Sequence, residues 1–130
     1  NVFHTSSRIN STWGGNLIDM VRCAKYLEIM HEEKLLDNAA TMGKALLKEL
    51  ETFQAAHPVI SNARGKGLMC AFDLPTPEQR NKLRSKLYDN SVAILGCGER
   101  TIRFRPPLNI KPEHLGICME ALKKSVKEVL

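Results

Sequence analysis

Apolar residues recur at helical spacing in two stretches near the start of the chain. The first stretch holds Leu17, Met20, Val21, Ala24, Leu27 and Met30, and the second holds Ala39, Met42, Gly43, Leu46, Leu50 and Phe53. Steps of three and four residues place these side chains on one face of an α-helix. The pattern therefore predicts helices over residues 16–32 and about 36–56. Pro58 limits the second helix, because the residue before a proline is disfavoured in helical conformation.

The pattern changes to strands after this helix. The stretch "PVIS" at 58–61 is predicted as a short extended piece, and "RGKG" at 64–67 as a turn that frees the backbone. From Leu68 to Leu74 both alternating faces are largely apolar, which favours a central strand. Two further strands are predicted for "VAIL" at 92–95 and "TIRFR" at 101–105, with the loop "GCGER" between them.

Two more helices complete the predicted order. The stretch "TPEQ" has the capping-box pattern with Pro77 at the first helical position, so a helix is predicted over about 77–90. The last predicted helix covers about 112–130. Its inward positions are Leu115, Cys118, Met119, Leu122, Val126 and Val129. The order is therefore two helices, two strands, a helix, two strands and a helix. We expect an α+β fold, a small antiparallel sheet of three to four strands with helices packed on one face.

Composition narrows the class of protein. The 130 residues suit one domain, and 43% hydrophobic with 25% charged residues is ordinary for a globular protein. The net charge of +5 is spread along the chain and aromatic residues make up only 5%, which argues against a nucleic-acid surface. No apolar run approaches the roughly 20 residues of a membrane span, and residues 1–15 do not resemble a signal peptide. Because the chain begins with Asn1, we expect an excised fragment.

The four cysteines do not form a metal-binding or disulfide pattern. They stand at 23, 70, 97 and 118, no pair has CxxC spacing, and the four histidines are equally scattered. We therefore expect no metal site, and we expect reduced, buried thiols in a cytoplasmic protein.

Two stretches are candidates for anion binding. Arg103 and Arg105 in "TIRFRPPL" are two residues apart on a predicted strand, so both side chains leave by the same face, and a guanidinium matches a carboxylate or phosphate. The stretch "NSTWGGN" places hydroxyls and glycine amides before a helix, where an anion can bind. A solvated sheet edge and a plain helix cap are the alternatives, and both stay open. No nucleophile or base is recognisable, so the chain looks like part of an active site.

These stretches together resemble the C-terminal small domain of class III pyridoxal-phosphate aminotransferases. The motifs are "STWGGN", "RGKGLMCAF" and "TIRFRPPL". The family pattern has a proline after Gly-Gly-Asn, where this chain has Leu17. That departure, with "RINSTWGGN" and "GLMCAFDLP", is most similar to the branch that acts on L-lysine, the lysine 6-aminotransferases. The stretches "RNKL" and "GCGERTIRFRP" also resemble the 4-aminobutyrate branch.

The resemblance implies roles by position. Thr12 matches a threonine whose hydroxyl reaches the phosphate of pyridoxal 5′-phosphate in the neighbouring subunit's site. Arg103 matches the arginine that holds the α-carboxylate of 2-oxoglutarate or glutamate. Asn10 is expected to line the same pocket, and Arg105 is expected to form a structural pairing. Residues 1–15 would be the connecting segment with the cofactor-phosphate motif and 16–130 the α+β body.

The resemblance also implies a reaction and partners. The whole enzyme would move the ε-amino group of L-lysine to 2-oxoglutarate, giving 2-aminoadipate 6-semialdehyde and glutamate. No catalytic residue is assigned to this chain, because the lysine, aspartate and aromatic that engage the cofactor belong to the large domain. The expected partners are the small-molecule substrates, that large domain and a second copy in a homodimer, with neither nucleic acid nor membrane. A 4-aminobutyrate or ornithine aminotransferase and a stand-alone basic binding module are the alternatives.

Overall fold

The computed structural model describes residues 4–6, 8 and 11–129. Its helices and strands follow the predicted order. The elements are α1 (Leu17–Glu32), α2 (Leu35–Ala56), β1 (Ser61–Lys66), β2 (Met69–Asp73), α3 (Pro77–Asp89), β3 (Leu95–Cys97), β4 (Thr101–Phe104) and α4 (Pro112–Val129). The chain divides into two compact units, Asn1–Lys34 and Leu35–Leu130.

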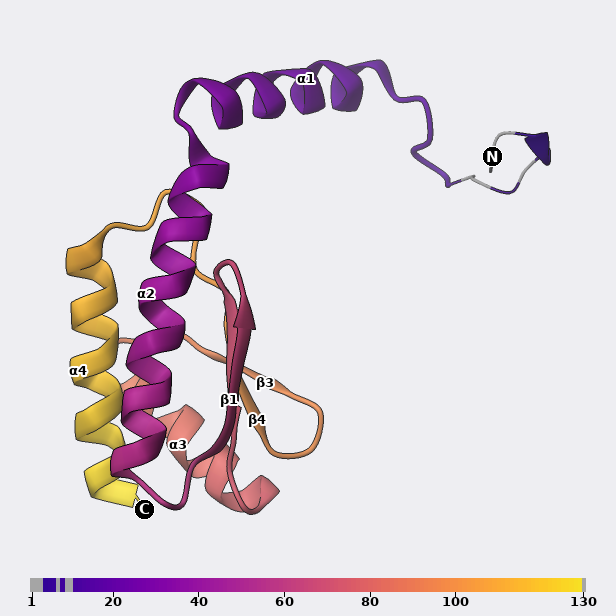
Figure 1. The fold of residues 1–130 in the computed structure, drawn as a ribbon. Coiled ribbons are helices and arrows are strands. Elements are labelled where there is room, and N and C mark those ends of the chain that lie inside the picture. The colour runs from indigo at the N-terminus through magenta and orange to yellow at the C-terminus, as the bar shows by residue number, and fades with distance from the viewer. Residues whose placement is uncertain (1–3, 7, 9–10, 130) are drawn as a thin grey trace. The chain divides into compact units, whose positions relative to one another are not determined.

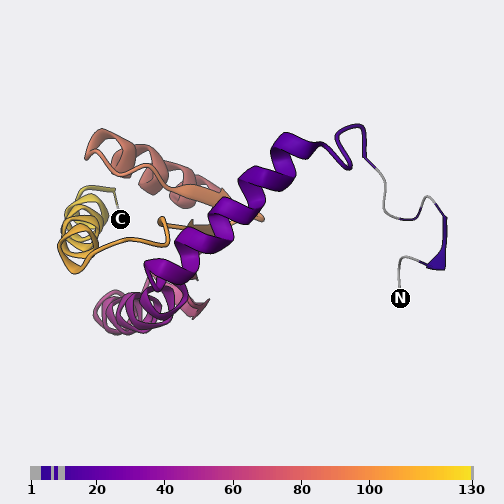
Figure 2. The ribbon, with the colours of Figure 1, turned by 90° about the horizontal axis from the view of Figure 1, so that it is seen from above.

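The second unit is a sheet with helices on one face (Figure 1). Its four strands are antiparallel in the order β1-β2-β4-β3. Helix α2 packs on β1 and β2, α3 packs on β3 and β4, and α4 packs against both α2 and α3. Figure 2 shows these three helices together on one side of the strands. The expected α+β fold with a central strand β2 is confirmed.

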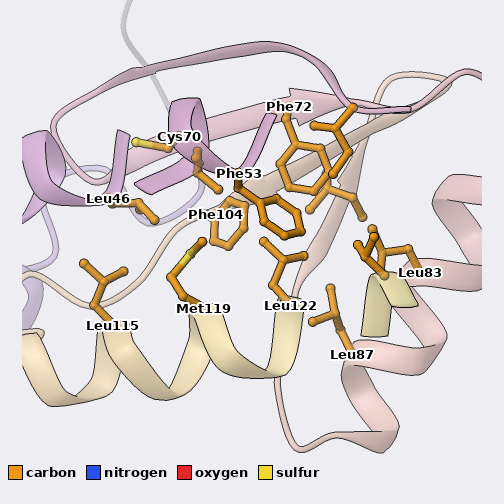
Figure 3. Packing of buried hydrophobic residues seen from close by; sticks show 14 of the residues in the cluster. Leu46, Phe53, Cys70, Phe72, Leu83, Leu87, Phe104, Leu115, Met119 and Leu122 are labelled. Atoms are coloured by element: carbon orange, nitrogen blue, oxygen red, sulfur yellow. The ribbon is translucent and has the colours of Figure 1, made fainter. Parts of the chain in front are cut away.

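The core lies between this sheet and the three helices (Figure 3). Every second residue of the two central strands points into it, because side chains alternate across a strand. These inward residues are Cys70, Phe72, Ile102 and Phe104. Helices contribute Leu46, Leu50, Phe53, Leu83, Leu87, Met119 and Leu122, all buried.

The predicted boundaries of the first hairpin were wrong. Arg64 to Lys66 belong to β1 rather than to a turn, and β1 begins at Ser61, the last residue of the predicted extended piece. The turn is Gly67–Leu68, where Gly67 takes a φ of +54°. A glycine in the first position of a two-residue hairpin turn tolerates this conformation without steric cost. The shorter turn lets Arg64 and Lys66 pair with Ala71 and Met69.

The predicted strand at 92–95 was also wrong, since β3 begins only at Leu95. The chain leaves α3 through a turn in which Ser91 has a φ of +64° and the Val92 amide donates to the Leu87 carbonyl at 2.8 Å. Strand β4 ends at Phe104, and continued antiparallel pairing would put Val92 opposite Pro106. A proline has no amide hydrogen to donate, so Val92 has no complete ladder partner there.

The first unit contains α1, which has no buried residue. Most of its apolar side chains are exposed, among them Leu17, Ile18, Met20, Val21, Tyr26 and Leu27. Asn16 caps the helix, because its side-chain oxygen accepts hydrogen bonds from the amides of Ile18 and Asp19 at 2.9 and 3.3 Å.

Candidate functional site

Arg103 lies in the middle of β4, on the face of the sheet that the helices leave uncovered. Across the sheet, one row of register partners runs Arg64, Ala71, Arg103, Leu95. Its neighbours Ile102 and Phe104 are buried on the opposite face. The predicted alternation is therefore confirmed. Ala71 carries only a methyl group, so the row leaves room beside the Arg103 side chain.

The guanidinium of Arg103 is incompletely satisfied. Its Nε is buried and has no hydrogen-bond partner among the described residues, and no ion pair there involves Arg103. A buried donor of a charged group without an acceptor is costly, and a carboxylate is its natural complement. The position therefore suits an incoming anion.

Arg105 follows two residues later and is exposed beyond the end of β4. The structural pairing expected for it does not occur within the described part of the chain, where none of the ion pairs includes it. Arg103 and Arg105 instead line one cavity of about 220 Å³ next to the sheet.

A polar cluster on the same uncovered face was missed by the sequence analysis. The carboxylate of buried Asp73 accepts hydrogen bonds from the Thr101 hydroxyl at 2.6 Å and the Asn62 side chain at 2.8 Å. The Arg64 guanidinium completes the cluster at 3.0 Å from the same carboxylate. Burial acts to raise the pKa of Asp73, but these hydrogen bonds and the Arg64 charge outweigh it and hold that pKa below its ordinary value.

The backbone conformation of β1 orients the side chains of this cluster. Between Ser61 and Arg64 the register shifts by a bulge, and Asn62 within it has a φ of +55°. A bulge turns a side chain out of the regular alternation, which brings the Asn62 amide to Asp73. Asparagine tolerates left-handed backbone better than most residues. The sequence carried no local signal for the pairing of Asp73 with Thr101, because the two residues lie 28 positions apart.

Thr12 lies in the first unit, in an exposed turn before α1. The Gly14 amide donates to the Ser11 carbonyl at 3.0 Å, which closes this turn around Thr12. Within the described residues the Thr12 hydroxyl makes no hydrogen bond, and Thr12 is exposed. Asn10, also expected to line the pocket, lies outside the described residues.

At the N-terminus of α1 itself, the structure favours the alternative interpretation, a plain helix cap. Asn16 already occupies two first-turn amides of α1, and Asp19 places a negative charge there, paired with Arg22. A phosphate would meet that carboxylate rather than free amides. Any anion binding at "NSTWGGN" therefore depends on the turn and the Thr12 hydroxyl, not on the helix terminus.

Cys70 is buried and Cys118 half-buried, but Cys23 and Cys97 are exposed, so the expectation of buried thiols was wrong for these two. Among the described residues, no group of three or more His, Cys, Asp or Glu side chains is placed to hold a metal ion. None of the described helices has the length and apolar character that crossing a bilayer requires.

Comparison with known proteins decides the family. Residues 1–126 match the family model described as aminotransferase class-III. The chain belongs to the class III aminotransferases. This class III chain is 49% identical over 128 residues to the L-lysine-epsilon aminotransferase of Amycolatopsis lactamdurans, covering 97% of this chain and 28% of that protein. The human mitochondrial 4-aminobutyrate aminotransferase is 43% identical over 108 residues, 82% of this chain and 22% of that protein.

Solved structures of the class agree with the fold. The lysine aminotransferase from M. tuberculosis matches with a TM-score of 0.90 and 41% identity, covering 100% of this chain and 30% of that one. The class III chain thus spans less than a third of the length of these relatives. Its sheet, helices and two arginines correspond to one portion of these longer relatives.

Proposed function

We propose that this chain is the C-terminal small-domain portion of a pyridoxal-phosphate-dependent aminotransferase that moves the ε-amino group of L-lysine to 2-oxoglutarate. The products would be 2-aminoadipate 6-semialdehyde and glutamate. The whole-chain similarity to several L-lysine-epsilon aminotransferases, 42–49% identical over 97–99% of this chain, supports lysine as the donor. The 4-aminobutyrate relatives match a smaller share of the chain, 82%.

The observation that carries the proposal is the buried Nε of Arg103 on the uncovered sheet face, which has no hydrogen-bond partner in the part of the chain that the structure describes. Catalysis of amino transfer requires that the keto acid be held in one orientation, and a planar guanidinium binds a carboxylate through two parallel hydrogen bonds. In this role Arg103 would bind and orient the α-carboxylate. Asn10 would line the same pocket.

The residues present also fit a contribution to cofactor binding. The Thr12 hydroxyl is exposed in a closed turn, so it would donate a hydrogen bond to the phosphate of pyridoxal phosphate. When bound, the cofactor takes up and releases the amino group. This chain would supply a phosphate anchor and a carboxylate anchor, and the remainder of the enzyme would supply the catalytic groups.

The uncovered face would dock against the large domain of the same polypeptide. This face carries exposed Met69 and Leu95 beside Arg103, whereas three helices cover the opposite face. Apolar side chains next to charged ones on an open sheet face are typical of an interaction surface.

We further infer that the working enzyme is a homodimer, in which Thr12 serves the partner's site. The four free cysteines of this chain support a cytoplasmic location for the enzyme.

The test is a donor comparison with the full-length protein that contains this chain. L-lysine, 4-aminobutyrate and L-ornithine are offered separately with 2-oxoglutarate, and glutamate formation is measured. We expect kcat/KM for lysine to exceed that for the other two donors by at least about tenfold, a difference of about 1.4 kcal/mol in transition-state binding. A preference for either rival donor would overturn the proposal that lysine is the amino donor. No transfer from any donor would overturn the proposal that the protein is an aminotransferase.

A further inference from the structure

Strands β3 and β4 separate beyond the pair Leu95–Arg103, and a cavity lies where they part. Pairing ends there because β3 starts at Leu95 and β4 stops at Phe104. The cavity of about 220 Å³ is lined by residues 92–95 on one side and residues 103–106 on the other. Leu46 of α2 and Leu115 of α4 also line it.

The lining of this cavity is apolar except for two arginines. Its apolar side chains include Leu46, Val92, Ile94, Phe104, Ile110 and Leu115. The charged residues that line it are Arg103 and Arg105, and no acidic side chain does so. A ligand that matches this lining has an apolar body and one anionic head.

The unsatisfied Arg103 Nε points to the same ligand. That nitrogen is buried without an acceptor among the described residues, and Arg105 adds a second, exposed guanidinium at the cavity. A carboxylate satisfies both guanidinium groups and cancels part of their mutual repulsion.

We propose that this cavity binds an aliphatic monocarboxylate of about six carbons, with the carboxylate at Arg103 and Arg105 and the chain among the apolar side chains. A cavity of about 150 Å³ accommodates benzene, so this one has room for roughly nine non-hydrogen atoms. The ligand differs from both proposed substrates, because lysine and 2-oxoglutarate are polar at both ends. If Arg103 also binds the keto acid, a point that rests on the proposed function, the monocarboxylate competes with 2-oxoglutarate.

Calorimetric titration of the full-length protein tests the ligand class without requiring turnover. Hexanoate is compared with butanoate, with the uncharged hexanamide and with hexylammonium, at one ionic strength. We expect hexanoate to bind about tenfold more tightly than butanoate, because each buried methylene contributes roughly a factor of four. It should also bind at least tenfold more tightly than hexanamide. Equal binding of the amide, or no binding of hexanoate to a protein that still transfers amino groups, would overturn the proposal and leave the proposed function standing.

Cys118 reports where the acid binds, because its half-buried side chain lines the cavity. Hexanoate should slow alkylation of Cys118 by an uncharged reagent, measured by peptide mass spectrometry. Cys23 and Cys97 are exposed and do not line the cavity, so they serve as controls in the same sample. Unchanged Cys118 alkylation at saturating hexanoate would place the acid elsewhere and overturn the site.

Variants separate the two halves of the cavity. Cys118→Leu fills the apolar part and should weaken hexanoate binding at least tenfold, whereas Ile117→Phe adds bulk at an exposed neighbour on α4 and should not. Arg105→Met changes an exposed side chain and should also weaken binding, with Arg100→Met as the matched arginine control outside the cavity. Hexanoate affinity unchanged in Arg105→Met contradicts the proposal even if Cys118→Leu fails to fold.

Discussion

Gly43 of α2 and Gly67 of the β1–β2 turn are in direct backbone contact. A Cβ added to Gly43 would lie 2.2 Å from the Gly67 carbonyl oxygen, closer than non-bonded atoms approach. The thiol of Cys70 lies 3.5 Å from the same oxygen. Through this contact α2 packs closely on one side of the β1–β2 hairpin. The other side of the hairpin carries Arg64 and Asp73, so the contact helps to fix the position of the uncovered face.

Gly43→Ala is expected to destabilise the fold by about 1–3 kcal/mol, the usual cost of forcing extra volume into a packed interior. The three atoms nearest to the added Cβ are all backbone atoms of Gly67, so the strain is not relieved by a rotamer change. Gly116→Ala is the matched control, because Gly116 lies in α4 with no atom within 4 Å of the added Cβ. It should stabilise by up to about 1 kcal/mol through helix propensity. Urea unfolding measures both, and a neutral Gly43→Ala would contradict the contact.

Ser91→Gly is expected to stabilise the fold by about 1 kcal/mol. Ser91 has a φ of +64° at the end of α3, where glycine carries no steric penalty. The turn hydrogen bonds from the amides of Ser91 and Val92 would remain. Ser91→Val should destabilise, because a β-branched side chain fits this conformation poorly. Thermal unfolding of the two variants checks the opposite signs, and a shift of the same sign in both would show that the turn conformation does not limit stability.

The Asp73 cluster should make stability depend on pH in the acid range. The pKa of Asp73 is lower in the folded protein than the unfolded value of about 3.9, so the unfolded state binds more protons there. Its contribution is therefore complete well above pH 4 and is lost as the pH falls through the depressed folded pKa. Asp73→Asn should flatten the fall of the free energy of unfolding between about pH 5 and 2. Glu51→Gln, an exposed change in α2, is the control, and equal slopes in both variants would remove Asp73 as the cause.

Thr12→Ala in the full-length enzyme should weaken cofactor retention by about one to two decades. A hydroxyl that donates to a phosphate forms a charge-assisted hydrogen bond worth roughly 1.5–3 kcal/mol. Thr12→Ser keeps the hydroxyl and should retain much of the affinity. Equilibrium dialysis of pyridoxal phosphate measures the dissociation constant, and an alanine variant with unchanged affinity would exclude Thr12 from the site.

Arg103→Ala should damage the half-reaction with 2-oxoglutarate far more than the half-reaction with lysine. The lost carboxylate contact is expected to cost roughly 2–5 kcal/mol if the pair is desolvated. Arg103→Lys should rescue poorly, because an ammonium lacks the planar fork of a guanidinium. Single-turnover kinetics of each half-reaction provide the measurement. Equal damage to both halves, or a larger effect from Arg105→Ala, would show that the role belongs elsewhere.

Local pattern in the sequence was enough to predict the helices and the orientation of the key arginine. Helical spacing located α2 and α4, the capping pattern before Pro77 located α3, and alternation placed Arg103 opposite Ile102 and Phe104. These properties depend on residues a few positions apart, and such residues interact whatever the remainder of the chain does. The motifs around Thr12 and Arg103 likewise indicated the class III family before any fold was known.

Tertiary structure decided the features that join distant residues. The β1–β2 turn moved to Gly67–Leu68 because pairing with β2 extended β1 to Lys66, and β3 shortened because β4 ends before Pro106. The Asp73 cluster and the cavity beside Arg103 each combine side chains from three or more elements. No local pattern encodes such contacts, because strand register and helix packing are set by the burial of the whole core.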